Sequence, residues 1–529
     1  MSAPDGASWD AIVIGSGMGG MTFASLAAQV LGKRVLVLEQ HWQAGGLTHA
    51  FRREGWRWDV GLHYLGGLAP GGSTRQVFDL VTGGAVALAP LPDRYDVIHD
   101  GAQSYGVPGD LALMEAELAR RFPHEAKGIR RYFALTRRIN RGLGTALFAP
   151  SAPGWMGGLI RLVSWRTLRL ARRTTREVIA ECVADPALRH ILAARWGDYG
   201  VPPSESAFGY HALILGSYGE GAWYPEGGGG AIARAVTRVL RARGGEVRLN
   251  TAVRRILVEN GRAVGVEVAD AHGKVSQLRA EVIVSNAGIA RTAALAGFAA
   301  PALAPSPSAV TLYLGLSDDP RKLGVDGANH WFVLPGAEGE RLASLADLTS
   351  DQPPMAFVSF SSVVEGATTK HTAQVMTLAE PGAFAGWEGT QWRERGDEYA
   401  ALKERIAAAA IARLDKAFPG IAASVAMHEL STPLTVERFT GQAGGSIYGA
   451  GVTPARLAAR IGARTPLKGL LLTGADVCTP GVQGAMMGGV FAAAALGGAA
   501  GLPRIMAAAA KAARRPASAV PNPAPALAS

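Results

Sequence analysis

Cysteine is scarce in this sequence. Only Cys182 and Cys478 occur among 529 residues, which excludes a domain held together by a framework of disulfides and is typical of a reducing compartment. The first eight residues, MSAPDGAS, also lack the charged stretch and the apolar stretch of a secretory signal peptide. We therefore expect a cytoplasmic protein.

Acidic residues are fewer than basic ones. The chain has 43 Asp and Glu against 53 Lys and Arg, a formal net charge of +10, which suits an anionic partner such as nucleic acid or membrane headgroups. No nucleic-acid-binding motif is present, and basic and aromatic residues do not interleave along a strand pattern. We expect no nucleic-acid partner, and a membrane surface is the better candidate.

Long runs of Leu or Ile are missing as well. Residues 485–502 contain no charged or strongly polar residue, and a run of that length would just span a bilayer. The run consists mostly of Ala and Gly, which give little drive for insertion. We therefore expect a buried, closely packed helix in place of a transmembrane span.

The clearest pattern that is present is a βαβ unit in residues 10–46. An apolar run ends at Gly15-Ser16-Gly17-Met18-Gly19-Gly20, a helix-compatible segment follows, and Val35–Leu38 forms a second apolar run. Gly15, Gly17 and Gly20 fit G-x-G-x-x-G, in which the glycines allow a sharp turn, approach of a pyrophosphate to the backbone, and close helix packing. The helix start, with Met18 and Gly19, offers free N–H groups to phosphates.

Glu39 completes the unit at the end of the second strand, followed by Gln40. A carboxylate at this spacing can accept hydrogen bonds from an adenosine ribose. The alternative is a glycine-rich turn in an ordinary α/β domain, with Glu39 as a solvated charge. The unit predicts dinucleotide binding, without distinguishing FAD from NAD. Because the chain has one such fingerprint, we expect no stable NAD(P)H site.

A second glycine pair, Gly45-Gly46, follows six residues after Glu39, and the segment Trp58–Gly66 reads WDVGLHYLG. Together these residues resemble the FAD enzymes of the amine oxidase and phytoene desaturase superfamily, and within it the retinol saturase and carotenoid isomerase branch. Amine oxidases and bacterial phytoene desaturases usually have Arg after the glycine pair, whereas Leu47 stands here. This difference disfavours both of those activities.

The resemblance implies FAD as the cofactor and extends to two later segments. The segment from Trp223 to Gly228 resembles the start of the family's middle FAD segment, and a stretch around Val253 would reach the adenine. A strand-end turn at Asn286 would follow, and a last FAD segment would contain Gly474, Asp476, Gly481, Val482 and Gln483. Asp476 would hold the ribityl chain or the pyrophosphate, and the helix start would face the flavin pyrimidine.

The expected fold is a Rossmann-like α/β FAD-binding domain interleaved with an α+β substrate domain. FAD-binding parts are expected at residues 1–90, 221–300 and 441–504, with a helical substrate and membrane-facing part at 91–220 and a substrate-binding sheet at 301–440. Period-two alternation in four runs of the last part predicts an antiparallel sheet with one buried face. Residues 505–529, rich in Ala and Pro, are expected to be a disordered tail.

Residues 155–176 carry six arginines and no acidic residue. On a helical wheel Trp155, Leu159, Leu162, Val163 and Leu170 gather on one side and most arginines on the other, a pattern typical of a helix lying in the headgroup region of a membrane. The alternative is a surface helix whose arginines cover its own core-facing side. We expect a peripheral membrane association through this segment.

For catalysis, a C=C or CH–CH unit must lie over the flavin with a proton donor or acceptor nearby. The resemblance places His63 and Tyr64 there, the first as an acid or base and the second as a relay; a His hydrogen-bonded in the core is an equal alternative. Cys478 is expected to be a packed thiol, and no metal site is expected. The sequence thus favours saturation or isomerisation of a retinoid-like or carotenoid-like polyene. Desaturation by the same cavity and a non-catalytic lipid escort protein of the same architecture are the alternatives.

Overall fold

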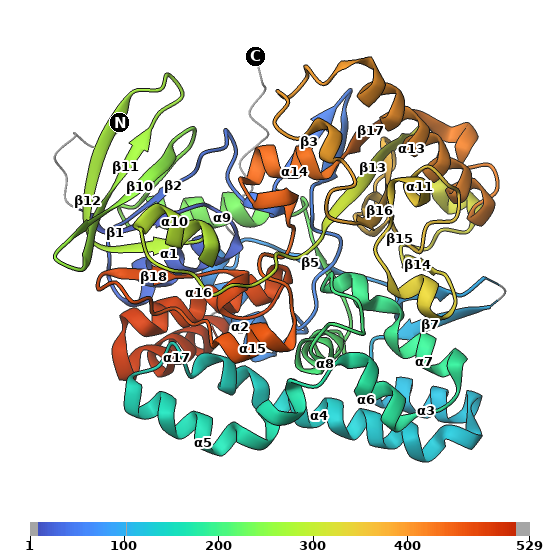
Figure 1. Ribbon diagram of the computed structural model, residues 1–529, viewed down its shortest axis with the longest axis horizontal. Coiled ribbons are helices and arrows are strands. Elements are labelled where there is room, and N and C mark those ends of the chain that lie inside the picture. Colours follow the sequence, from blue (N-terminus) through green and yellow to red (C-terminus); the bar gives the residue numbers. More distant parts are fainter. Residues whose placement is uncertain (1–8, 102, 515–529) are drawn as a thin grey trace.

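The computed structural model describes residues 9–101 and 103–514, and it contains two large sheets above a layer of helices (Figure 1). The first sheet holds the N-terminal βαβ unit. Its parallel part has the order β9-β2-β1-β12-β18. The bounds are β1 (Trp9–Ile14), β2 (Val35–Leu38), β9 (Glu246–Arg248), β12 (Val275–Ser285) and β18 (Leu470–Leu472). Three distant stretches of chain therefore build one sheet, which is called the nucleotide-binding sheet below.

The first half of β12, residues 275–279, extends beyond the parallel sheet and pairs antiparallel with β11 (Arg262–Ala269). Strand β11 in turn pairs with β10 (Ala252–Glu259). The three strands form the layer at the left of Figure 1. The arrangement brings the start of β10, and with it Val253, to the edge where the parallel strands end.

The apolar run 485–502 is not one long helix. Helix α16 (Gly481–Leu496) is mostly buried and packs on α1 (Met18–Val30), and the chain then turns into α17 (Gly501–Ala513). A Cβ on Gly489 would lie 2.6 Å from the carbonyl oxygen of Gly19, so small residues are needed for this close contact. Within the described residues, no helix is both long and apolar enough to cross a bilayer.

The predicted tail begins too early. Residues 505–513 belong to α17, in which Ile505 and Ala509 are fully buried because they lie one turn apart on the face that contacts α2 (Ser73–Thr82). Residues 515–529 lie outside the described part of the chain.

The second sheet has the order β17-β13-β16-β15-β14-β6-β7 and contains the four alternating runs predicted to form it. All its pairs are antiparallel except β14 with β6. The bounds are β6 (Arg94–His99), β7 (Ser104–Pro108), β13 (Ser308–Leu316), β14 (Asn329–Val333), β15 (Met355–Ser359), β16 (His371–Ala379) and β17 (Val425–Ser431). Two of these strands come from the part of the chain expected to be mainly helical.

The prediction of one buried face is wrong for the centre of this sheet, because every residue of β13 and β15 is buried. Val310, Leu312 and Leu314 pack with α13 (Gly396–Ala417) on one side. Trp331 and Phe357 join the larger core with the helical layer on the other. Helices thus cover both faces, so that alternation marks two different cores and not a solvent-facing side.

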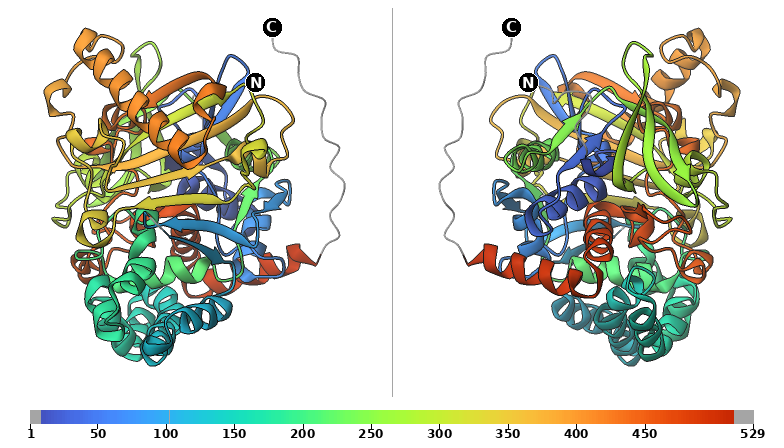
Figure 2. Two further views of the ribbon diagram at one scale, coloured as in Figure 1. Left: turned by 90° about the vertical axis from the view of Figure 1, so that its right-hand side faces the viewer. Right: turned by 90° about the vertical axis from the view of Figure 1, so that its left-hand side faces the viewer.

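The helical layer lies at the base of the molecule in both views of Figure 2. It contains α3 (Leu111–Arg121), α4 (Ala126–Phe148), α5 (Gly154–Ala171), α6 (Thr175–Cys182), α7 (Pro186–Ala193) and α8 (Phe208–Ser217). The remaining helices are α9 (Gly230–Arg241), α10 (Ile289–Ala296), α11 (Leu345–Leu348), α12 (Ser361–Val364), α14 (Pro433–Thr440) and α15 (Pro454–Ala459). Short strands complete the fold: β3 (Ala50–Arg53), β4 (Trp56–Asp59), β5 (Leu88–Pro90) and β8 (Trp223–Pro225).

Candidate active site

A cavity of about 1130 Å³ runs along the edge of the nucleotide-binding sheet, somewhat above the ~300–1,000 Å³ usual for small-molecule sites. Most of the predicted cofactor residues line it: Gly15, Gly17, Met18, Gly19, Glu39, Gln40, Gly45, Gly46, Leu47, Val253, Asn286, Asp476, Gly481 and Val482. These residues come from all three of the predicted FAD-binding parts. The fold therefore brings together what the sequence separates by hundreds of residues.

Three predicted cofactor residues do not line the cavity. A Cβ on Gly20 would lie 2.2 Å from the carbonyl oxygen of Gly15, and Gly474 packs against Gly19, where a Cβ would lie 2.4 Å from its Cα. Both glycines thus allow the close packing that shapes the cavity wall. The amide of Gln483 lies against Gly67.

The start of α1 is suited to a phosphate. Its N-cap, Gly17, provides no side-chain cap, and the first turn contains no acidic residue, so the first N–H groups keep their positive partial charge. Gly46 closes the other side: its φ is +56°, and a Cβ there would lie 3.0 Å from the Cα of Gly17. Backbone donors and a wall without side chains form a cradle for a pyrophosphate.

Glu39 is buried at the adenosine end. Its Oε2 accepts hydrogen bonds from Ser16 N at 2.9 Å and Ser16 Oγ at 2.6 Å, and its Oε1 accepts one from His41 N at 2.9 Å. Gly45 N donates to Ser16 Oγ at 3.0 Å, which ties the second glycine pair to the same carboxylate. A carboxylate offers about four acceptor positions, so Oε1 retains one for a ribose hydroxyl.

Asp476 links three segments of chain that line the cavity. Its Oδ2 accepts from Ile289 N and its Oδ1 from Ala450 N, both at 2.8 Å. The carboxylate therefore joins the turn before α10, the segment before α15 and the turn before α16. The N-terminus of α16 opens into the same cavity with no side-chain cap and no acidic residue in its first turn, a positive end suited to an electron-rich ring. An elongated cavity with two uncapped helix starts and a buried carboxylate that retains an acceptor position fits FAD.

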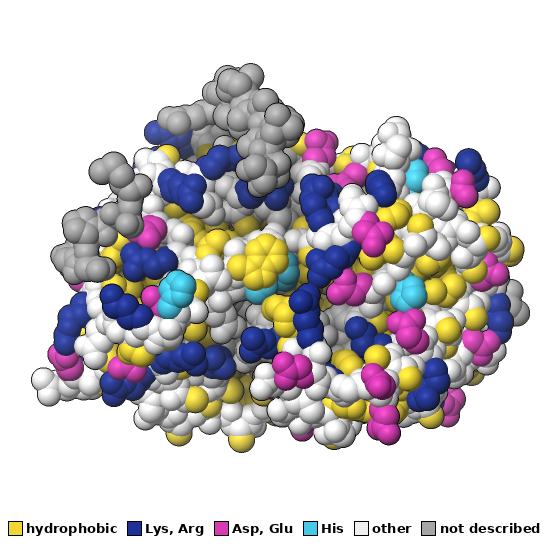
Figure 3. Space-filling view, turned by 90° about the horizontal axis from the view of Figure 1, so that it is seen from above, with side chains coloured by type: hydrophobic (Ala, Val, Ile, Leu, Met, Phe, Trp, Pro, Cys, Tyr) yellow, Lys and Arg dark blue, Asp and Glu magenta, His cyan; other side chains and the backbone are white. Residues whose placement is uncertain are grey.

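Charged side chains of both signs line the outer end of the cavity, and Arg53 pairs there with Glu429. Arginines from β3, from the segment leading into α13 and from α14 line it: Arg53, Arg393, Arg395 and Arg438. These elements lie at the top in Figure 1, and Figure 3 shows Lys and Arg side chains along that upper face.

The two predicted catalytic residues lie outside the lining of this cavity. His63 Nδ1 is 2.9 Å from Ser359 Oγ, and burial lowers the pKa of His63 to about 4. The imidazole is therefore neutral at neutral pH and cannot act there as an imidazolium acid. Burial likewise raises the pKa of the Cys478 thiol to about 12, as expected for a packed thiol.

Tyr64 belongs to a buried polar cluster. Its hydroxyl is 2.9 Å from Asp198 Oδ1 and 3.2 Å from Asp96 Oδ2. Arg195 Nη1 lies 3.0 Å from the same Asp96 oxygen and 2.5 Å from the hydroxyl of Tyr95. Because Tyr64 has one hydroxyl hydrogen, it can donate to only one carboxylate, and the other contact is a hydrogen bond only if that carboxyl is protonated.

The surroundings of Asp198 favour the protonated form of its carboxyl group. Burial is the largest influence on Asp198 and raises its pKa to about 7, with Asp96 also raising it and Arg195 opposing. Asp198 Oδ2 is buried without a hydrogen-bond partner in the described residues. Two carboxyl groups facing one guanidinium therefore favour one shared proton near neutral pH.

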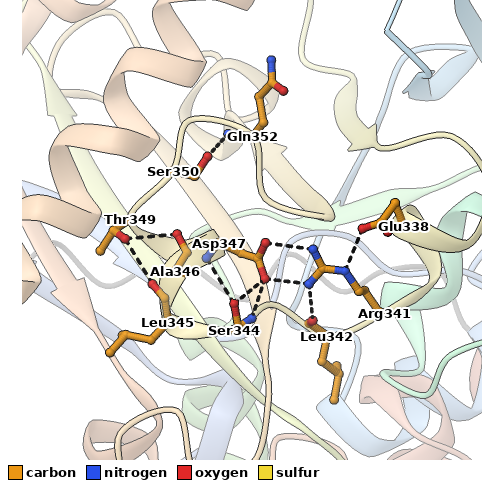
Figure 4. A network of polar contacts seen from close by, with 10 residues as sticks. All are labelled: Glu338, Arg341, Leu342, Ser344, Leu345, Ala346, Asp347, Thr349, Ser350 and Gln352. Atoms are coloured by element: carbon orange, nitrogen blue, oxygen red, sulfur yellow. Dashed lines mark hydrogen bonds and ion pairs between the residues drawn. The ribbon is translucent and has the colours of Figure 1, made fainter.

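Asp198 lies directly behind the cavity wall. Tyr448 lines the cavity, and its hydroxyl donates to the carbonyl oxygen of Gly197 at 3.2 Å. On the other side, Trp196 Nε1 donates to Gly339 O at 2.8 Å. The loop containing Gly339 is stiffened by Arg341, which bonds Asp347 and Glu338, and by Ser344, which caps α11 (Figure 4).

The sequence predictions missed Asp96, Arg195 and Asp198. No motif marks them, since they come from a sheet strand and from the turn after α7. The one available signal was an acidic residue between Tyr95 and Val97 in the strand Arg94–His99, where a buried charge needs partners.

Comparison with known families decides the identity of the fold. The model described as flavin containing amine oxidoreductase matches residues 18–497. The chain belongs to this family. Its α/β fold, its class as a flavin-dependent oxidoreductase and the cofactor FAD, all predicted above, are thereby confirmed.

Curated relatives of this flavoprotein include all-trans-retinol 13,14-reductase of Danio rerio, 30% identical over 90% of this chain and 84% of the relative. Prolycopene isomerase of Daucus carota is 28% identical over 89% of this chain and 77% of the relative. The crystal structure of an oxidoreductase from Methanosarcina mazei has the same fold, with a TM-score of 0.61 at 18% identity over 90% of this chain and 98% of that one.

Proposed function

We propose that the protein is an FAD-dependent oxidoreductase that saturates or isomerises a C=C bond of a hydrophobic polyene of the retinoid or carotenoid type. The relatives named for a retinol reductase and a carotenoid isomerase support the substrate class. The observation that carries the mechanism is the Tyr64 hydroxyl held between Asp96 and Asp198 behind the cavity wall.

Saturation of a C=C bond requires one hydride and one proton. When bound, reduced FAD supplies the hydride and the electron pair. Tyr64, which lies behind the cavity wall, passes its hydroxyl proton toward the cavity for the second carbon, and Asp198, whose pKa burial raises to about 7, returns a proton to Tyr64 along the 2.9 Å hydrogen bond. Arg195 limits the build-up of negative charge when Asp198 loses its proton. Asp198 then takes a proton from solvent, which returns Tyr64 and Asp198 to their starting protonation states.

The ring of Tyr64 is held in place by other aromatic rings. Its ring lies 4.8 Å from that of Tyr218, 6.0 Å from that of Phe357 and 6.1 Å from that of Tyr95. These contacts are direct ring packing, which fixes the orientation of the Tyr64 hydroxyl. The polar cluster then offers a proton in a region from which water is excluded.

We further propose that the protein docks on a membrane surface through α5. Trp155, Leu162 and Val163 are 70%, 69% and 71% exposed, and Leu159 is also exposed, so the apolar side predicted for the helix faces solvent and not the core. Leu170 is half-buried and does not contribute. The predicted segment ends beyond the helix, where Arg173 and Arg176 are paired with Glu181 and Glu340. The docking surface is therefore α5 itself, at the base of Figure 1.

The deciding experiment is anaerobic. The flavin of the purified protein is reduced with dithionite, polyenes are added in liposomes, and flavin absorbance is followed while products are separated by chromatography and weighed by mass spectrometry. A product heavier by two hydrogens, with reoxidised flavin, identifies a saturase; an unchanged mass with altered retention, and flavin that stays reduced, identifies an isomerase. Bleaching of the oxidised enzyme by a more saturated substrate would identify a desaturase instead. Bound polyene without any flavin would identify a lipid escort protein.

A further inference from the structure

A second cavity, of about 670 Å³, lies beside α5. One face of the helix lines it, with residues that recur every three or four positions: Gly158, Arg161, Leu162, Trp165, Arg169 and Arg172. Residues from the end of α4 and the segment after it, from α8, from α15 and the two residues after it, and from the turn before α16 form the rest of the wall. Leu162 and Trp165, which are 69% and 51% exposed, lie both on this wall and on the surface of the molecule.

The lining of this cavity is strongly cationic. It contains five arginines, two from α5, Arg172 directly after that helix, Arg456 and Arg460, and none of them forms an ion pair within the described residues. The only acidic residue on the wall is Asp476, and both of its oxygens already accept backbone N–H groups. The cavity thus holds positive charge that its own wall does not neutralise.

Arg456 is the innermost of these arginines and is only 2% exposed. Its Nη1 donates to Ala450 O, and its Nη2 donates to Ala475 O, so its hydrogen bonds go to neutral carbonyl groups. Its guanidinium carbon lies 5.1 Å from the ring centre of Tyr210. A buried charge normally faces a counter-charge, and the single carboxylate of Asp476 cannot balance five arginines, so the cavity is suited to an anion from outside.

We propose that this cavity binds the phosphate of an anionic phospholipid headgroup. Guanidinium groups bind phosphate oxygens in pairs with matching geometry. The mouth at Leu162 and Trp165 continues into the exposed apolar side of α5, which provides a surface for the acyl chains of the same lipid. A free phosphate would bind the arginines but would not contact the apolar residues at the mouth. We therefore assign a lipid.

Lipid binding in this cavity would also affect residues that line the flavin site. Asp476 lines both cavities, and Arg456 holds the carbonyl of Ala475, the preceding residue. This proposal rests on the membrane docking proposed above and adds to it a specific headgroup site. Docking through apolar contacts alone needs no such site, so the two can fail separately.

The test uses the FAD-loaded, full-length protein and two kinds of vesicle, phosphatidylcholine alone and phosphatidylcholine mixed with phosphatidylglycerol, in a flotation assay. The cavity variant carries Arg161→Gln, Arg169→Gln and Arg460→Gln. The control carries Arg138→Gln, Arg141→Gln and Arg166→Gln, which remove the same charge from exposed positions of α4 and α5 outside the cavity. Circular dichroism and flavin content verify that each variant is folded.

We expect the cavity variant to lose about tenfold or more in affinity for the mixed vesicles relative to the control, with little change on phosphatidylcholine alone. Equal losses in the two variants would overturn the headgroup site while leaving membrane docking intact. Trp155→Ser with Val163→Ser tests the docking itself and should weaken binding to both vesicles; no vesicle binding by the wild type would refute both proposals. Inorganic phosphate is the competitor: arginine-dependent phosphate binding in calorimetry, with vesicle preference unchanged in the cavity variant, would reassign the cavity to a soluble anion.

Discussion

Tyr64 and Asp198 are hydrogen-bonded at 2.9 Å although 134 residues separate them in the chain. Asp96 approaches the same hydroxyl from a third segment, and the aromatic rings around it exclude water. A buried acid, a relay hydroxyl and a second carboxyl group with a compensating arginine form a unit that can deliver one proton. Most of our predictions follow from this unit and from the glycine-lined cavity beside it.

Tyr64→Phe removes the hydroxyl and keeps the ring. We expect the rate of saturation to fall by about 10²–10⁴, with little change in KM, since Tyr64 lies outside the lining of the cavity and its ring packing is retained. Single-turnover reduction of the polyene, followed by mass, measures the effect. Tyr105→Phe is the matched control, because that ring is also buried and its hydroxyl has no partner in the described residues. Similar rates in the two variants would remove Tyr64 from the proton path.

The pH dependence of turnover should reflect Asp198. Burial raises its pKa to about 7, so the proton-donating form is present below this pH and is lost as the pH rises through it. We expect the rate of saturation to fall above about pH 7 in the wild type. In Asp198→Asn the rate should be low and flat across the same range. A decline centred at the same pH in the Asn variant would assign the titration to another group.

The free energy of unfolding should also depend on the protonation of Asp198. The folded pKa of Asp198 lies above that of an unfolded Asp, about 3.9, so the native state binds more protons between roughly pH 4 and 7 and this group's contribution to the free energy of unfolding falls as the pH rises. We expect Asp198→Asn to gain stability relative to the wild type between pH 5 and 8. Urea unfolding at both pH values measures the difference. A constant difference would mean that Asp198 is not protonated in the native protein.

Glu39→Gln tests the adenosine end of the cofactor site. Glu39 accepts three hydrogen bonds from Ser16 and His41, and losing a charge-assisted bond of this kind corresponds to about 10- to 100-fold in affinity. Fluorescence titration of flavin-free protein with FAD should show this loss. Glu267→Gln, on β11 and paired with Arg255, should bind FAD like the wild type; equal weakening in both would point to a general change in charge.

Gly20→Ala tests the packing of α1 on the strand before it. The new Cβ would lie 2.2 Å from the carbonyl oxygen of Gly15, so the helix must shift, at a cost of about 1–3 kcal/mol. Urea unfolding and flavin content should both decrease. Gly144→Ala, where a Cβ in α4 meets nothing within 4 Å, should be neutral or stabilising by up to about 1 kcal/mol. A neutral Gly20→Ala would show that α1 is not fixed by this contact.

Local patterns in the sequence determined the nucleotide-binding half of this protein. The turn Gly15–Gly20, the strand ending at Glu39 and the helix after Asp476 depend on glycine conformations and short-range periodicity, so they could be predicted without knowing their neighbours. Tertiary structure alone decided the rest. The cluster of Asp96, Arg195 and Asp198 forms only when a strand of the second sheet meets the turn after α7, and no local pattern encodes contacts across so many residues. The burial of both faces of β13 and the outward turn of the apolar side of α5 have the same cause. The side of an element that is buried depends on which distant elements pack against it.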